Sequence, residues 1–144
     1  MPTFRFPVVL LFLALLGLTL GNCKNNNEPE PEKPTIQASQ LTSGSWRLDQ
    51  IKQNGQVTSS GASIKDQYSL TFRTDGTYTQ KILADNTVYN GTWMLMSNNT
   101  ILHLTDHKGD DIHYTLASLT ATELRYSFTN KNNQIEELVF SAQP

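Results

Sequence analysis

From Trp46 to the C-terminus the chain consists of short runs in which apolar and polar residues alternate, and Asn, Asp and Gly separate each run from the next. Alternation with a period of two is typical of β-strands that have one buried and one solvated face. No long stretch of this part repeats its apolar residues at the helical spacing. The pattern predicts an all-β domain with eight strands, over residues 45–53, 66–73, 77–83, 87–96, 100–105, 111–118, 123–129 and 134–141.

The turns between these strands predict the pairing, because a one-residue slip would send every side chain to the opposite face. All connections are short enough for hairpins except residues 54–65. We expect loops of two or three residues at 74–76 (with Gly76 left-handed), 85–86, 98–99 and 108–110. The expected pairs are Phe72 with Tyr78, Leu70 with Gln80, Ile82 with Tyr89, Tyr78 with Trp93, Leu95 with Leu102, Trp93 with Leu104, Leu104 with Tyr114, Leu102 with Leu116, Tyr114 with Tyr126, and Leu116 with Leu124.

These pairs place one apolar and aromatic set on a single face and a polar set on the other. An open sheet of this kind would expose its edge strands and an apolar surface, and closure removes both. We therefore expect an eight-stranded antiparallel up-and-down barrel. In the last strand the pattern leaves open whether Ile135 and Val139, or Leu138 and Phe140, face inward.

The N-terminus has the features of a secretory signal peptide. Arg5 precedes an apolar run, residues 8–20, that is too short to span a bilayer of about 30 Å as a stable anchor. Cleavage after small residues and cleavage before Cys23 are the two alternatives. Cys23 is the only cysteine of the chain, so in a secreted protein its thiol would have no disulfide partner and would be exposed to oxidation. Cleavage before Cys23 with attachment of lipid to the thiol removes that reactive group. We therefore favour a signal peptide over residues 1–22.

The segment Leu20-Gly21-Asn22-Cys23 resembles the lipobox of bacterial lipoproteins, although Asn22 departs from the usual small residue. That resemblance implies acyl chains on Cys23, palmitate among them, and a lipid-anchored protein of the cell envelope. Residues 23–37 are rich in Asn, Glu and Pro and read as a disordered tether, and residues 38–144 as the barrel domain. The Lys-Asn-Glu composition after Cys23 is similar to export signals of Bacteroidetes lipoproteins. We expect the protein to be anchored in the outer membrane, with the domain facing the periplasm or the cell surface.

Two Gly-x-Trp motifs mark the predicted domain: Gly44-Ser45-Trp46 opens the first strand and Gly91-Thr92-Trp93 lies in the fourth, after which residues 101–104 follow a tight turn. In this order of features the domain resembles the bacterial lipocalin-like lipoproteins, which are small barrels of the calycin group. The resemblance covers about residues 40–141 and implies that Trp46 closes the barrel floor. The first half is also similar to the META domain of lipoproteins, but the Gly-Cys-Asn segment usual in that family is replaced by Lys81-Ile82-Leu83.

The composition excludes several classes of function. The net charge is −2 with acids and bases interspersed, which argues against nucleic acid as a partner. No serine or cysteine lies in a nucleophilic motif, so we expect a protein that is not an enzyme and needs no cofactor. A weak metal site that involves His103, His107 and His113 is one alternative, but we expect these side chains to be solvated and to bind no metal.

The predicted interior contains all five tyrosines and Gln80. Buried hydroxyls need partners, at a cost of about 1–3 kcal/mol each if unmet. We expect the barrel to bind a small apolar or amphipathic ligand in its interior. The alternative is a barrel with a solid core. Such a protein would be a protein-binding module, an inhibitor or an envelope accessory, and would act through its loops. A cavity of at least about 300 Å³ favours the ligand. The candidate binding residues are Leu70, Phe72, Tyr78, Gln80, Tyr89, Trp93, Leu104, Tyr114 and Tyr126.

Overall fold

The computed structural model describes residues 37–143. The predicted signal peptide, the predicted lipidation site Cys23 and the predicted tether up to residue 36 lie outside the described residues. The elements in chain order are α1 (Ala38–Leu41), β1 (Ser45–Gln53), β2 (Gln56–Ser60), the 3-10 turn η1 (Gly61–Ser63), β3 (Tyr68–Phe72), β4 (Thr77–Ile82), β5 (Val88–Met96), β6 (Ile101–Thr105), β7 (Asp111–Leu119), β8 (Glu123–Thr129) and β9 (Ile135–Gln143). Neither helical element of this part is long and apolar enough to cross a bilayer.

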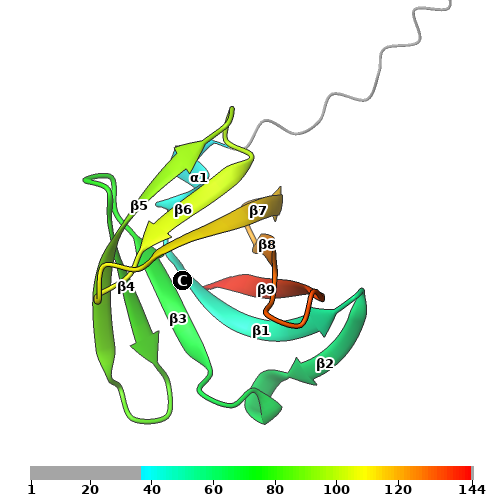
Figure 1. The fold of residues 1–144 in the computed structure, drawn as a ribbon. Coiled ribbons are helices and arrows are strands. Elements are labelled where there is room, and N and C mark those ends of the chain that lie inside the picture. Colours follow the sequence, from blue (N-terminus) through cyan, green and yellow to red (C-terminus); the bar gives the residue numbers. More distant parts are fainter. Residues whose placement is uncertain (1–36, 144) are drawn as a thin grey trace, which may run out of the picture. The chain divides into compact units, whose positions relative to one another are not determined.

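The strands form one antiparallel sheet that closes on itself (Figure 1). Strands β3 to β9 pair in chain order, and β1 pairs with β3 on one edge and with β9 on the other. The prediction of a closed eight-stranded up-and-down barrel is confirmed. The ninth strand, β2, is an addition to the edge of β1 rather than a barrel stave.

The edge of β1 that faces away from β9 is divided between two partners, β3 and β2. Its first residues, Ser45–Arg47, pair with β3, and its last, Gln50–Gln53, pair with β2. Asn54 and Gly55 both have positive φ, of 47° and 83°, and connect β1 to β2 as a two-residue turn. Asn-Gly is a strong hairpin signal. The prediction that residues 54–65 form a connection without a hairpin was therefore wrong.

Two of the predicted hairpin registers are confirmed and two are displaced by two residues. Phe72 faces Tyr78, with Gly76 left-handed at φ 82°, and Leu95 faces Leu102. In the β4–β5 hairpin, however, Gln80 faces Tyr89, and in the β6–β7 hairpin Leu102 faces Tyr114. A shift of two residues leaves every side chain on its predicted face.

Aspartate side chains explain both displacements. Asp85 Oδ1 accepts a hydrogen bond from the Thr87 amide at 2.9 Å, and only Asn86 of the predicted two-residue turn has positive φ, so a longer loop forms. Asp106 Oδ1 accepts from the amides of Lys108 at 2.8 Å and Asp110 at 3.0 Å, so that turn begins two residues earlier than predicted.

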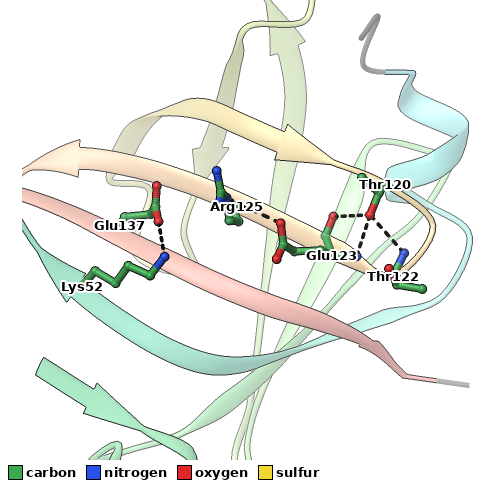
Figure 2. A network of polar contacts seen from close by, with 6 residues as sticks. All are labelled: Lys52, Thr120, Thr122, Glu123, Arg125 and Glu137. Carbon is green, nitrogen blue, oxygen red and sulfur yellow. Dashed lines mark hydrogen bonds and ion pairs between the residues drawn. The ribbon is translucent and has the colours of Figure 1, made fainter. Parts of the chain in front are cut away.

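The β7–β8 hairpin also differs from the prediction, which paired Leu116 with Leu124. A register shift between Leu116 and Ser118 makes Leu119 the partner of Leu124. The turn is fixed by Thr120, whose Oγ1 accepts hydrogen bonds from the amides of Glu123 at 3.0 Å and Thr122 at 3.3 Å (Figure 2). The bulge turns Leu119 inward, where it is buried.

The core lies inside the barrel and extends to the end that carries α1. In β9 the inward residues are Leu138 and Phe140, while Ile135 is exposed, which settles the alternatives left open by the sequence. The seam between β1 and β9 carries a salt bridge on the outside, from Lys52 Nζ to Glu137 Oε1 at 3.1 Å (Figure 2). The buried side chains are Leu41, Trp46, Leu48, Ile64, Leu70, Phe72, Tyr78, Leu102, Leu104, Leu116, Leu119, Leu124, Tyr126, Leu138 and Phe140.

Candidate ligand-binding pocket

A pocket of about 300 Å³ opens at one end of the barrel. Antiparallel strands bring the β4–β5, β6–β7 and β8–β9 loops to this end, which we call the open end, whereas α1 and the β3–β4 turn lie at the other, the closed end. The pocket is lined by Tyr68, Leu70, Tyr78, Gln80, Tyr89, Leu104, Asp106, His107, Ile112, Tyr114 and Tyr126.

Burial increases from the rim of the pocket to its floor. Leu70, Leu104 and Tyr126 are buried and form an apolar floor, and Tyr89 and His107 are exposed at the rim. The Tyr89 and His107 rings stack there, with centroids 4.4 Å apart and an interplanar angle of 27°. The gradient from apolar floor to polar rim suits a molecule with one apolar and one polar end.

The tyrosines form a contiguous cluster rather than separate core residues. The rings of Tyr114 and Tyr126 have centroids 4.4 Å apart. The Tyr126 hydroxyl donates a hydrogen bond to the Tyr68 oxygen, which raises the pKa of Tyr126 and partly opposes the rise at Tyr68. Among the described residues, the Gln80 amide and the hydroxyls of Tyr78, Tyr89 and Tyr114 have no hydrogen-bonding protein partner. Those groups are available to a ligand.

The buried tyrosine hydroxyls, those of Tyr68, Tyr78, Tyr114 and Tyr126, stay protonated well into alkaline solution. Burial is the main cause that raises the pKa of Tyr114 to about 12, followed by the ionised form of Tyr78 and by Glu136 and Asp106. Burial, and then Asp106, also raise the pKa of Tyr78. Burial is likewise the largest cause of the raised pKa values of Tyr68 and Tyr126. At neutral pH the cluster therefore presents neutral hydroxyls that both donate and accept.

Asp106 places a negative charge at the rim. Hydrogen bonds from the amides of Asp110 and Lys108 are the largest causes that hold the pKa of the Asp106 carboxyl below its usual range. All hydrogen bonds that this carboxylate accepts from the described residues go to Oδ1. The second oxygen, Oδ2, is thus left for water or a ligand.

The structure brings seven of the nine predicted binding residues together and leaves out two. Phe72 is buried, and Trp93 lies at the closed end, where its Nε1 donates to the Arg73 carbonyl at 2.9 Å. Tyr68 was predicted to face inward but was not among the predicted binding residues. Sequence reasoning also missed Asp106, His107 and Ile112, because it started the β6–β7 turn at Lys108. Asp106 stands three residues before Gly109, a spacing that suits an aspartate-capped turn and could have revealed the longer loop.

Trp46 and the histidines lie away from the pocket. Trp46 is 1% exposed, and its Nε1 donates to the Leu41 carbonyl at 2.9 Å, which ties β1 to α1 at the closed end. His103 and His113 stack on each other on the outer face, with centroids 4.5 Å apart. Within residues 37–143, no three His, Cys, Asp or Glu side chains are placed to hold a metal ion.

The chain is similar to a known domain family and to two solved structures. The lipocalin-like domain family matches residues 42–126, a range that contains every residue lining the pocket. The crystal structure of a DUF4847 family protein from Bacteroides vulgatus is similar with a TM-score of 0.49 at 14% identity, over 72% of this chain and 96% of that one. A redesigned beta barrel is similar with a TM-score of 0.45 at 13% identity, over 78% of this chain and 100% of that one. No curated protein sequence matches the chain.

Proposed function

The chain belongs to the lipocalin-like domain family, and we propose that it is a non-enzymatic binding protein that holds a small apolar or amphipathic molecule inside its barrel. The observation that carries the proposal is the pocket of about 300 Å³ at the open end, with unpaired tyrosine hydroxyls above an apolar floor. That volume lies at the low end of the range of about 300–1,000 Å³ for small-molecule sites. A hollow of this size supports ligand binding rather than a solid barrel that acts only through its loops.

The pocket chemistry supports a binding role rather than catalysis. The lining residues include one imidazole, His107, but no serine, threonine or cysteine that it could activate. His107 stacks on Tyr89 instead, an arrangement that suits recognition of a planar or apolar group. We therefore assign the pocket residues to binding.

Native mass spectrometry tests the ligand. The mature chain is purified from its own host, and a copurified small molecule is expected as a discrete added mass. Gln80→Trp fills the hollow and should abolish that mass, whereas Lys81→Trp adds the same side chain to the exposed outer face of β4 and should retain it. Retention of the mass by Gln80→Trp would place the ligand outside the barrel, and a bare mass for the unaltered chain would count against the proposal.

The lipid anchor is the second part of the proposal. The apolar run and the Leu-Gly-Asn-Cys segment support cleavage before Cys23 and attachment of the mature protein to the outer membrane. Metabolic labelling with an alkyne analogue of palmitate should mark the chain in a bacterial host and leave Cys23→Ala unmarked. An unmarked parent chain, or an N-terminus that begins elsewhere than Cys23, would refute the anchor and leave the pocket proposal untouched.

A further inference from the structure

The charged residues of the pocket, in addition to its shape, favour one class of ligand. Of its lining residues, Asp106 is anionic and none is a lysine or arginine. His107 is the one lining side chain that can acquire a positive charge, and its ring is engaged with Tyr89 at the rim. Lys108 stands beside Asp106 in the loop, but its side chain does not line the pocket.

Glu136 adds negative charge from β9. It pairs with Phe128 two residues before the inward pair of Leu138 with Tyr126, so it faces the interior of the barrel. Its charge is felt by Tyr68 and Tyr114, whose pKa values it helps to raise. Asp106 acts on Tyr78 and Tyr114 in the same sense.

The fixed charges of the pocket distinguish anions from cations. Burial is the largest cause of the raised pKa values of Tyr78 and Tyr114, and it disfavours an ion of either sign. The charges of Asp106 and Glu136 add to the rise, and they also disfavour a second anion such as the carboxylate of a ligand. A cation gains from the same charges. Neutral hydroxyls can donate to an anion or accept from a cation, so the fixed charges decide which ligand the site prefers.

We infer that the pocket selects an organic ammonium compound, whose charged nitrogen lies at the rim against Asp106 and whose apolar part rests on the floor formed by Leu70, Leu104 and Tyr126. An ammonium group can donate hydrogen bonds to Asp106 Oδ2 and to the side-chain oxygen Oε1 of Gln80. It can also donate to the unpaired hydroxyl oxygens of the tyrosines. Tyrosine rings also attract cations, increasingly so when water is excluded. This inference rests on the proposed function and narrows it to a ligand class.

The test uses three probes of one shape: 3-phenylpropylamine, 3-phenyl-1-propanol and 3-phenylpropanoate. Their binding to the mature chain with Cys23→Ser, which needs no detergent, is measured by calorimetry. We expect the amine to bind about tenfold more tightly than the alcohol, and the carboxylate to bind most weakly. If the alcohol or the carboxylate binds as tightly as the amine, the inference is overturned while the proposed function stands. If none of the three binds, the inference falls, and the copurified mass decides separately on the proposed function.

Asp106→Asn isolates the charge, because the asparagine carbonyl oxygen can still accept the two loop amides that Oδ1 binds. We expect it to weaken the amine about five- to tenfold and to leave the alcohol within twofold. Asp110→Asn removes the same charge from an exposed position outside the pocket and should change neither. Equal loss of amine and alcohol in Asp106→Asn, or equal loss of amine in both variants, would overturn the role of Asp106.

Discussion

The two ends of the barrel contain similar aromatic residues but treat their polar atoms differently. At the closed end the indole nitrogens of Trp46 and Trp93 each donate to a main-chain carbonyl, of Leu41 and Arg73, at 2.9 Å. At the open end, Tyr78, Tyr89 and Tyr114 of the described chain have hydroxyls without a protein partner. The first arrangement completes the core, and the second leaves hydrogen-bonding capacity around a hollow.

The difference follows from what covers each end. Helix α1 places Leu41, which is fully buried, and the carbonyl that Trp46 needs over the closed end. Phe72 contacts Trp93 edge-to-face there, with centroids 5.6 Å apart. The open end is surrounded by loops, and the Asp106 loop keeps its own amides bonded to Oδ1 instead of filling the pocket. The closed end is therefore filled by packed side chains, whereas the open end retains the hollow in which we propose that a ligand binds.

Trp46→Ala should produce the largest effect, because it removes the buried side chain that joins the closed end to β1. Large-to-small changes of buried aromatic residues cost about 3–5 kcal/mol of the free energy of unfolding. Urea denaturation followed by circular dichroism measures the loss. Met94→Ala, at a position that is 54% exposed, is the control and should stay within about 0.5 kcal/mol. A small loss at Trp46 would show that the closed end is not where stability resides.

Alkaline pH should lower the stability of the fold through the buried tyrosines of the open end. Tyr114 titrates near 12 in the folded chain, and the pKa values of Tyr68 and Tyr126 are raised as well, against about 10 in an unfolded chain. Raised pKa values mean that the folded state holds its protons longer. The stability from these groups is therefore complete below pH 10 and is lost as the pH rises toward 12 and beyond, by up to about 1.4 kcal/mol per pH unit for each tyrosine.

Urea denaturation between pH 9 and pH 12 measures that decline. Tyr126→Phe removes one of the titrating groups and should make the decline shallower, although it also loses the hydrogen bond to Tyr68. Trp93→Phe changes the closed end, and the slope of stability against pH should stay that of the parent chain. A parent chain whose stability is flat across this range would contradict the buried tyrosine cluster.

Gly91→Ala should lower the free energy of unfolding by an amount between those expected for the largest and the smallest effects. Gly91 faces Tyr78 in the β4–β5 pair, and a Cβ there would overlap the Thr105 carbonyl oxygen and come within 2.6 Å of the Tyr78 ring. Overpacking of this kind costs about 1–3 kcal/mol. Since the displaced ring lines the pocket, 3-phenylpropylamine binding should weaken as well. Thr92→Ala, at the exposed neighbouring position, is the control, and equal effects of both variants would contradict the explanation.

The faces of the barrel were predictable from the sequence because they depend only on parity. Gln80 and the tyrosines were assigned inward even though the β4–β5 and β6–β7 registers were displaced, since a shift of two residues preserves the face. The displacements themselves arise from side-chain hydrogen bonds of Asp85 and Asp106 to nearby amides. Such local bonds compete with the turn types that loop length alone suggests.

The rim of the pocket and strand β2 were harder to predict. Asp106 and His107 line the pocket only because the turn starts at Asp106, and the sequence gives no measure of how far a loop folds over a barrel end. Trp93 was assigned to the binding site by its inward parity, but parity does not state its height along the barrel axis. Asn54-Gly55 did signal the β1–β2 hairpin, and the expectation of one long connection overrode it.

The smallest effect is expected at the closure seam, which belongs to neither end. Lys52 and Glu137 form a salt bridge across β1 and β9 at 3.1 Å, with side chains 22% and 24% exposed. Ion pairs that water reaches contribute about 0–1 kcal/mol, because side-chain ordering and screening offset the attraction. Lys52→Met keeps the aliphatic length, so its free energy of unfolding should fall by less than about 1 kcal/mol, and by less still at high salt. Urea denaturation at two salt concentrations measures both. A loss as large as that of Trp46→Ala would mean that closure of the sheet, rather than the cap over one end, limits the stability of the barrel.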